Sequence, residues 1–243
     1  SQGVPIIACD CRVCNSTAPC DKRLRASILV KYEGQTILVD AGPDFRYQML
    51  RAGVKHLDAI LLTHNHKDHT GGLDDIRALN WIEQRPAEIY CEKYVLESLK
   101  NEYSYFFQEE KYPGAPEWNI NLIDEKPFSI NGVEIIPIRG LHYKLPVLGF
   151  RFGNFAYCTD MNYIAEEEFS KLKGVEVFVI NTVKEGKHIS HFSLSEAVEV
   201  CRKVGAKMSF LTHISHQLPP HKELADMLPK DIKPAYDGLE IEI

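Results

Sequence analysis

The alternation of apolar and polar positions predicts short β-strands along most of the chain. Residues 26–42 hold two β-branched apolar runs on either side of Glu33 and Gly34, which predicts a hairpin whose second strand ends at residues 40–42. Residues 57–63 are almost wholly apolar, as expected of a strand that is covered on both faces. Further strands are predicted at residues 87–91, 120–124, 133–140, 147–153, 155–160, 175–183, 207–213 and 239–243.

Helical spacing of apolar residues appears in the segments between these strands. Residues 73–84 and 92–107 are predicted helices, and residues 108–119 are a predicted loop because they carry two prolines and a glycine. Ser193 and Glu196 have the spacing of a capping box at the start of another helix. The remaining predicted helices are 164–173 and 221–228. This order, without an internal repeat, predicts one α/β domain over residues 1–243, built of two sheets with helices packed outside them.

The composition narrows the class of protein. Apolar residues make up 44% and charged residues 26% of the chain, which is typical of a globular protein with a sizeable core. The net charge of −6 disfavours a surface that neutralises extended nucleic acid. No apolar run approaches the length of a membrane span, and the first residues lack the pattern of a signal peptide. We therefore expect a cytoplasmic protein without membrane contact.

Seven cysteines, an odd number, cannot form a complete set of disulfides within the chain. Three of them cluster as Cys9, Cys11 and Cys14, a spacing at which thiolates can reach one tetrahedral zinc ion that still needs a fourth ligand. The alternative is that these cysteines are reduced and pack as small apolar residues. The other four are interpreted as core or surface residues without a function: Cys20, Cys91, Cys158 and Cys201.

A histidine-rich segment, 64-HNHKDH-69, directly follows the apolar strand 57–63. His64 and His66 can point to the same side of an extended chain, while Asp68 and His69 can turn toward a second point, so one loop can supply ligands to two metal ions. The alternative is a polar loop with chance histidines. Three more candidates lie at the ends of predicted strands or just after them, where loops converge on one rim: His142, Asp160 and His213.

The order of these residues resembles the metallo-β-lactamase-fold hydrolases across nearly the whole chain. Within that superfamily, residues 1–14, 210–217 and 236–241 are similar to the PhnP group, phosphodiesterases that open 5-phosphoribosyl 1,2-cyclic phosphate. The resemblance implies a four-layer αββα sandwich and a homodimer. Members of the group also have a strand and a glycine-rich turn ahead of the position of Ser1, which this sequence does not contain.

The resemblance also assigns roles to individual residues. It implies one ion held by His64, His66 and His142, a second held by Asp68, His69 and His213, and Asp160 bridging the two. It supplies His216 as the fourth ligand of the structural zinc. His191 matches the position of the family's proton donor; the alternative is that it only caps or orders its loop. His188 is interpreted as a bystander. We therefore expect His191 and Asp68 to take part in catalysis.

The chemistry of such a site agrees with phosphoryl transfer. Two divalent ions roughly 3.5–4 Å apart can hold a bridging hydroxide and stabilise the attacking and leaving oxygens of an in-line displacement. Imidazole and carboxylate ligands suit zinc, manganese or iron. The expected function is hydrolysis of a small cyclic phosphate by that hydroxide. The alternatives are a tRNA 3′-processing endonuclease, a lactone or thioester hydrolase on the same fold, and a non-enzymatic zinc-stabilised binding module. The candidates for binding a second phosphate are Arg139, Lys144 and Lys184.

Overall fold

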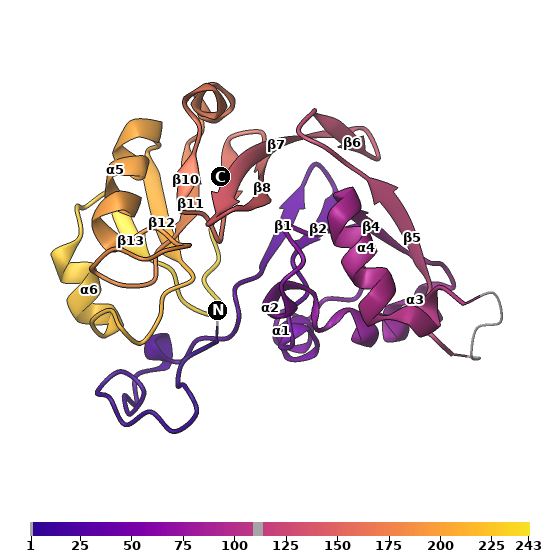
Figure 1. Cartoon of the computed structure of the whole chain (residues 1–243), viewed down its shortest axis with the longest axis horizontal. Helices are drawn as coiled ribbons and strands as arrows, with labels where there is room; N and C mark the ends of the chain where they lie inside the picture. The colour runs from indigo at the N-terminus through magenta and orange to yellow at the C-terminus, as the bar shows by residue number, and fades with distance from the viewer. Residues whose placement is uncertain (1, 109–113) are drawn as a thin grey trace. The chain divides into compact units, whose positions relative to one another are not determined.

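The structure is a computed structural model that describes residues 2–108 and 114–243 (Figure 1). The chain forms two compact units: unit 1 comprises Ser1–Arg25 and Ile135–Ile243, and unit 2 comprises Ala26–Glu134. Each unit contains a β-sheet and helices, so the predicted mixed α/β class with two sheets is confirmed. The prediction of a single domain over the whole chain stays a prediction.

Unit 2 is built on a five-stranded sheet in the order β1-β2-β3-β4-β5. β1 and β2 form the predicted antiparallel hairpin, in which Glu33 and Gly34 adopt positive φ angles of 48° and 79° that suit a tight turn. β2 to β5 run parallel, so their carboxyl ends lie at one edge of the sheet. The strands are β1 (Ile28–Tyr32), β2 (Gln35–Val39), β3 (Ala59–Leu61), β4 (Ala87–Cys91) and β5 (Trp118–Leu122).

Short helices connect these strands and cover their apolar side chains. Leu38, Ile60 and Ile89 from three neighbouring strands share one buried cluster with Val95 and Leu99 of a helix, all of them less than 2% exposed. This packing fixes the strands whose ends carry the polar residues described below. The helices are α1 (Phe45–Arg51), α2 (Lys67–Thr70), α3 (Arg77–Glu83) and α4 (Lys93–Glu102), with 3-10 turns η2 (Leu73–Ile76) and η3 (Ser104–Phe106).

Unit 1 is built on a larger sheet in the order β10-β7-β8-β9-β11-β12-β13, with β6 paired to β7. β8 is antiparallel to β7 and to β9, and β9, β11, β12 and β13 are parallel, so β7, β9, β11 and β12 end at the same edge. The strands of this sheet are β7 (Val133–His142), β8 (Leu145–Phe152), β9 (Phe155–Cys158), β10 (Tyr163–Ile164), β11 (Val177–Asn181), β12 (Met208–Thr212) and β13 (Ile232–Pro234), while β6 (Phe128–Ile130) falls within the residues of unit 2.

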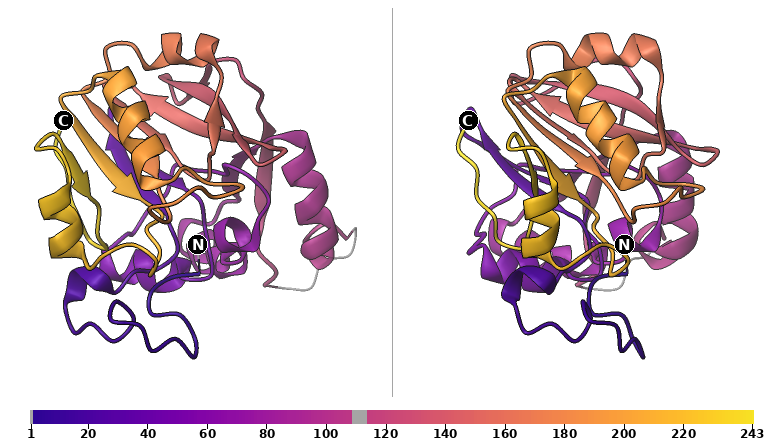
Figure 2. Two further views of the ribbon diagram at one scale, coloured as in Figure 1. Left: turned by 60° about the vertical axis from the view of Figure 1, so that its left-hand side comes forward. Right: turned by 90° about the vertical axis from the view of Figure 1, so that its left-hand side faces the viewer.

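Helix α5 (Leu194–Val204) confirms the predicted capping box, because Ser193 accepts from the Glu196 N–H and the Glu196 carboxylate accepts from the Ser193 N–H. Its buried residues Ala197 and Cys201 belong to the same apolar cluster as the strands of unit 1, and both views of Figure 2 show α5 lying along that sheet. The other helical elements of this unit are α6 (His221–Met227), η1 (Pro19–Asp21) and η4 (Glu166–Leu172).

Some predicted elements differ from the structure. The predicted strand 239–243 is wrong, since these residues have no regular structure and Leu239 donates into a turn at Tyr236. The strand that pairs with β12 is instead β13. This strand is short and contains Pro234, and a proline argues against a strand in the sequence. The predicted helix 164–173 is the 3-10 turn η4, and the predicted helix 73–84 begins as the 3-10 turn η2.

The helix predicted at residues 92–107 ends earlier, as α4 followed by η3. The predicted loop 108–119 falls partly on residues 109–113, which lie outside the described residues, and its last two residues belong to β5. Sequence periodicity did not predict α1, α2, β6 or β10, which are short. Among the described residues, no helix combines the length and the hydropathy needed to cross a bilayer.

Candidate metal centre

The histidine-rich segment of unit 2 lies just beyond the carboxyl end of β3. His64 follows that strand by three residues, and α2 begins directly after His66, so the chain turns within the motif. The ring centroid of His64 lies 4.6 Å from that of His66 and 4.3 Å from that of His69. The four predicted ligands of this segment, which also include Asp68, are therefore gathered in one small region of unit 2.

Asp40, at the end of the neighbouring strand β2, orients this segment. It is fully buried and lies at the same sheet edge as His64. Its carboxylate accepts from the Thr63 N–H at 2.9 Å and from His69 Nδ1–H at 2.6 Å. Burial raises the pKa of Asp40, and the contacts with His69 and Thr63 oppose that rise. A carboxylate that holds a metal-binding histidine in this way is a common feature of metal sites.

Sequence reasoning did not predict a role for Asp40, although it placed the end of a strand there. The parallel pairing of β2 with β3 is the signal that could have identified it, because residues just past the ends of parallel neighbours meet at one sheet edge. The hairpin pattern around Glu33 and Gly34 did not indicate this pairing, since β3 follows some twenty residues later. Only the register joins the two segments.

The donor atoms of unit 2 fit a divalent cation. His69 Nδ1 carries the proton that is donated to Asp40, which places the ring's lone pair on Nε2. That atom lies 3.2 Å from Asp68 Oδ2, which is also an acceptor. Two acceptors facing each other at this distance require a positive charge between them, either a proton or a metal ion. Imidazole with carboxylate is a donor set for zinc, manganese or iron.

Unit 1 gathers the three other predicted ligands of the dinuclear site at one edge of its sheet. His142 is the last residue of β7, Asp160 follows β9 by two residues, and His213 directly follows β12. His213 Nε2 lies 3.1 Å from Asp160 Oδ1. His142 Nδ1–H donates to the Ser190 carbonyl at 2.8 Å, so the lone pair of that ring is on Nε2. These residues therefore repeat the chemistry of unit 2.

Three of these strand-end residues have a left-handed backbone. The φ angle is 64° at Asp40, 55° at Asp160 and 56° at His213. A non-glycine residue in this region costs on the order of 1–3 kcal/mol, and such strain is concentrated at functional sites. Within each unit, the strain is consistent with side chains that must leave the strand direction directly after the strand ends.

The segment before α5 brings His191 to the same edge of unit 1. Its ring centroid lies 4.5 Å from that of His142 and 4.7 Å from that of His213, and its Nδ1 lies 3.7 Å from Asp160 Oδ1. Burial, followed by the charge of His213, lowers the pKa of His191 to about 3. A pKa this low leaves the ring neutral near pH 7. The ring of His188 lies 5.0 Å away, and its Nδ1 accepts from the Ser190 N–H.

The cysteine cluster of unit 1 also has the geometry of a zinc site. His216 Nδ1 lies 3.1 Å from Cys9 Sγ, 3.5 Å from Cys11 Sγ and 3.7 Å from Cys14 Sγ. Tetrahedral zinc with ordinary Zn–S and Zn–N bond lengths separates sulfur from nitrogen by roughly 3.6 Å, so the four atoms fit one ion. The structure thus brings together all four residues that the sequence and the resemblance had named.

Local hydrogen bonds prepare these sulfurs for a metal. The Cys14 N–H donates to Cys11 Sγ, which lowers the pKa of Cys11 to about 6, and the Ile6 N–H donates to Cys14 Sγ. Burial raises the pKa of Cys14. The other four cysteines are free thiols, and burial raises the pKa of Cys91 to about 12. The lowered pKa of Cys11 therefore favours the thiolate form that zinc requires.

The three cationic candidates for a second phosphate lie in unit 1. Arg139 lies within β7, Lys144 lies in the turn after that strand with Nζ 5.4 Å from the centre of the Tyr143 ring, and Lys184 follows β11. Their role in binding phosphate stays a prediction.

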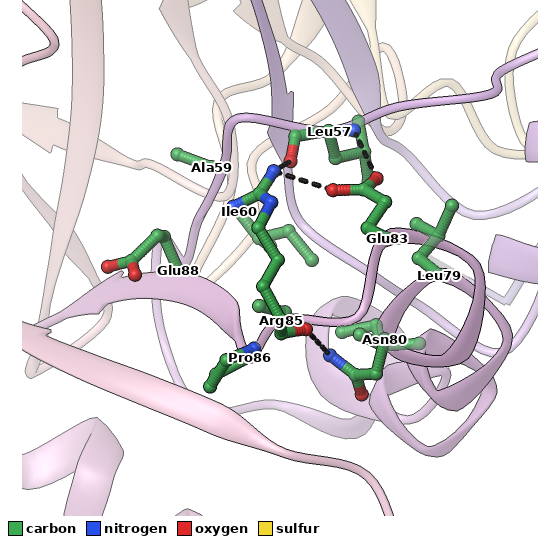
Figure 3. Close-up of a pocket in the computed structure, with 11 residues that line it drawn as sticks. Leu57, Ala59, Ile60, Leu79, Asn80, Glu83, Arg85, Pro86 and Glu88 are labelled. Carbon is green, nitrogen blue, oxygen red and sulfur yellow. Dashed lines mark hydrogen bonds and ion pairs between the residues drawn. The ribbon is translucent and has the colours of Figure 1, made fainter.

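A pocket of unit 2 lies apart from the predicted ligands (Figure 3). Arg85 in this pocket donates to the Leu57 carbonyl and pairs with Glu83, whose carboxylate accepts from the Leu57 N–H. The volume of this pocket, ≈ 10 Å³, has room for about one water molecule, so the pocket is a packing defect rather than a substrate site.

Comparison with known proteins defines the class of this protein. The sequence model of the "Beta-lactamase superfamily domain" matches residues 35–214, which include parts of both units. The chain belongs to this superfamily, has the metallo-β-lactamase fold and is a metal-dependent hydrolase.

Individual relatives show which members of the superfamily this chain resembles. A solved structure described as "a New Diphosphatase from the PhnP Family" is 36% identical, has a TM-score of 0.92 and is covered over 93% of its length by 100% of this chain. The chain is also 42% identical over 99% of its length to a protein of Porphyromonas gingivalis named octanoyltransferase, but it spans only 49% of that relative. Ribonuclease Z of Pyrobaculum calidifontis is 25% identical, over 84% of this chain and 86% of its own length. The predicted resemblance to the PhnP group is confirmed.

Proposed function

We propose that this hydrolase cleaves a phosphoric ester of a small phosphorylated molecule, and that a cyclic ribose phosphate is the substrate class that fits best. The observation that carries the proposal is the arrangement of His191 beside Asp160 and His213, because it places an imidazole that can exchange a proton next to two acceptors suited to a metal. The diphosphatase relative supports phosphorus chemistry in a protein of this family. Hydrolysis of a diphosphate and hydrolysis of a cyclic phosphate are the same type of reaction, since water displaces a leaving oxygen at phosphorus in each.

The proposed site uses seven ligands. One ion would be held by His64, His66 and His142, the other by Asp68, His69 and His213, with Asp160 shared. When bound, the two ions supply Lewis acidity that activates water and stabilises charge on the phosphoryl oxygens. The family match over residues 35–214 supports this assignment, because it includes every one of these positions.

The chain's own groups have separate tasks in this proposal. Asp40 keeps the proton of His69 on Nδ1, and the Ser190 carbonyl does the same for His142. His191 gives a proton to the leaving oxygen, a contribution that is typically ~10²–10⁴-fold. This role requires that His191 carry a proton in the complex, and an anionic substrate beside the ring would favour that charged form.

RNA cleavage and acyl hydrolysis are the competing functions. Ribonuclease Z relatives share the fold, but a net charge of −6 gives little general attraction for RNA. The octanoyltransferase name belongs to a relative about twice as long, so it does not specify what the matched half does. Both activities enter the test as alternative substrates.

The test is a substrate panel on protein reconstituted with manganese or zinc. The panel contains bis(p-nitrophenyl) phosphate, ribose 1,2-cyclic phosphate with and without a 5-phosphate, a dinucleoside diphosphate, precursor tRNA, a lactone and octanoyl thioester. We expect turnover of the cyclic phosphates, with Asp160→Asn inactive. Turnover confined to tRNA or to acyl substrates, at confirmed metal occupancy, would overturn the proposal.

Metal content and assembly complete the proposal. We expect two ions of manganese, zinc or iron at the dinuclear site and one zinc on Cys9, Cys11, Cys14 and His216, measured by mass spectrometry of the purified chain. Light scattering tests the proposed homodimer. The free thiols outside the cluster favour a reducing, cytoplasmic location.

A further inference from the structure

The segment that carries His191 is joined to its surroundings through backbone groups. Residues 188–192 have no regular secondary structure. The Ser190 carbonyl accepts from His142 Nδ1–H at 2.8 Å, the Ile189 carbonyl accepts from Asn162 Nδ2–H at 3.3 Å, and the Phe192 N–H donates to the Met161 carbonyl at 2.8 Å. The place of the His191 ring therefore depends on the residues that hold these three points.

Asn162 connects two of the loops at this edge of unit 1. Its Oδ1 accepts from the Tyr143 N–H at 2.7 Å, while its Nδ2 donates to Ile189, and its own N–H donates to the Leu141 carbonyl at 2.8 Å. The turn after the ligand His142 and the segment before His191 are thus held by one side chain. Asn162 can hold these two loops together without touching a metal-ligating atom.

Asn181, the last residue of β11, supports the third of these contacts, the hydrogen bond from the Phe192 N–H to the Met161 carbonyl. It is fully buried, its Oδ1 accepts from the Met161 N–H at 2.8 Å, and its Nδ2 donates to the Met161 carbonyl at 2.9 Å. The same carbonyl accepts from the Phe192 N–H. Asn181 therefore fixes the residue that follows Asp160 and, through it, the residue that follows His191.

We propose that Asn162 and Asn181 are positioning residues that set the place of His191 relative to Asp160 and His142. The proposal rests on the proposed function, in which His191 is the proton donor. Neither amide has a proton acidic enough to donate to a leaving group, so both act only through the backbone they hold. A displacement of about 1 Å in a reacting group can cost ~10²-fold in rate, which makes such support matter.

Aspartate substitutions remove one defined hydrogen bond at each position. Asn162→Asp keeps the acceptor for the Tyr143 N–H but loses the donor to Ile189. Asn181→Asp keeps the acceptor for the Met161 N–H but sets a carboxylate oxygen against the Met161 carbonyl. Asn154→Asp is the matched control, since Asn154 is exposed in the turn between β8 and β9.

The first measurement compares two leaving groups on metal-loaded protein. A ribose cyclic phosphate releases an alkoxide that needs a proton, whereas p-nitrophenolate leaves bis(p-nitrophenyl) phosphate without one. We expect kcat/KM for the cyclic phosphate to fall ~10- to 100-fold in both variants, with little change for the p-nitrophenyl ester. His191→Ala should show the same selectivity more strongly, and adding Asn162→Asp to it should cost little more. Equal loss on both substrates, at unchanged metal content, would contradict a positioning role.

The second measurement does not depend on activity. Amide hydrogen exchange of residues 188–192 should become about tenfold faster or more in both aspartate variants and stay unchanged in Asn154→Asp. If His191→Ala shows no leaving-group selectivity, the proton-donor role fails, while the exchange data still decide whether the two asparagines hold the segment. Unchanged exchange in both variants overturns the inference.

Discussion

The two groups of predicted metal ligands in unit 1 are supported in opposite ways. His142 ends a strand, and His213 and Asp160 follow strands by one and two residues. The ring of His142 is oriented by its hydrogen bond to the Ser190 carbonyl. The cysteine ligands lie in residues 1–25, where the 3-10 turn η1 is the one helix among the described residues. We therefore expect the strand-end ligands to be positioned by the fold before any metal binds, and the cysteine segment to depend on the proposed zinc for much of its structure.

The contrast extends to the apolar contacts. The cysteine segment has its own small cluster of Val4, Val13 and Cys14, and it is joined to the rest of unit 1 by polar contacts, such as those of Arg23 with Ala235 and of the His221 N–H with Asp21. The strand ends, by comparison, rest on a cluster that contains Phe178, Ile180 and Leu211, each of them fully buried. The two regions should respond differently to the same perturbation.

The largest effect is expected from Asp160→Asn. The substitution removes the negative charge of the carboxylate that is proposed to bind both metal ions. We expect a loss of several kcal/mol of transition-state stabilisation, which corresponds to a fall of about 10³-fold or more in kcat/KM. Steady-state rates with a phosphodiester substrate measure it. Circular dichroism should remain that of the parent protein, and a variant with near-parent activity would contradict the assignment of Asp160.

Asp40→Asn should have the next largest effect. The amide cannot replace the charge that orients His69, and loss of such an outer partner typically costs 10–100-fold in metal affinity or activity. Titration with manganese or zinc, followed by activity, gives the shift in apparent affinity. Asp124, an exposed residue of unit 2 between β5 and β6, supplies the control variant Asp124→Asn. Equal metal affinity in Asp40→Asn and the parent protein would remove Asp40 from the site.

Cys11→Ser tests the dependence of the cysteine segment on zinc. We expect one zinc ion fewer per chain and rapid proteolysis within residues 1–25, while phosphodiester hydrolysis changes less than about tenfold, since the strand-end ligands do not depend on this segment for their support. Limited proteolysis with mass spectrometry locates the cleavage, and Cys20→Ser is the control. Loss of activity as large as that of Asp160→Asn would show that the two regions are coupled.

The smallest effect is expected from Ser193→Ala. It removes the side-chain cap of α5, which typically costs ~1 kcal/mol of stability. Thermal unfolding should show that loss of stability. We expect kcat to be unchanged, because the segment that carries His191 is held by hydrogen bonds of Ile189, Ser190 and Phe192, which do not involve the Ser193 side chain. A large fall in kcat would instead indicate that the helix start positions His191.

Much of the fold was predictable because the signals were local. The hairpin at Glu33 and Gly34 and the capping box at Ser193 each depend on residues within a few positions of one another. The wrong strand at 239–243 shows the limit of that reasoning, since alternation of apolar and polar residues makes a strand possible but a neighbouring strand must pair with it. The edge beside β12 was filled by Ile232–Pro234 instead.

The sequence by itself determined which residues can bind metal, because His64 to His69 and Cys9 to Cys14 are close along the chain and their spacing alone limits what they can reach. Only the tertiary structure decided how those ligands are held. Asp40 meets His69 through the parallel register of β2 and β3. In unit 1, Asn162 bonds to the His191 segment at Ile189, and Asn181 bonds to Met161, whose carbonyl accepts from the Phe192 N–H. Contacts of this kind join residues that are 20 or more positions apart, so they depend on strand register and not on any local pattern.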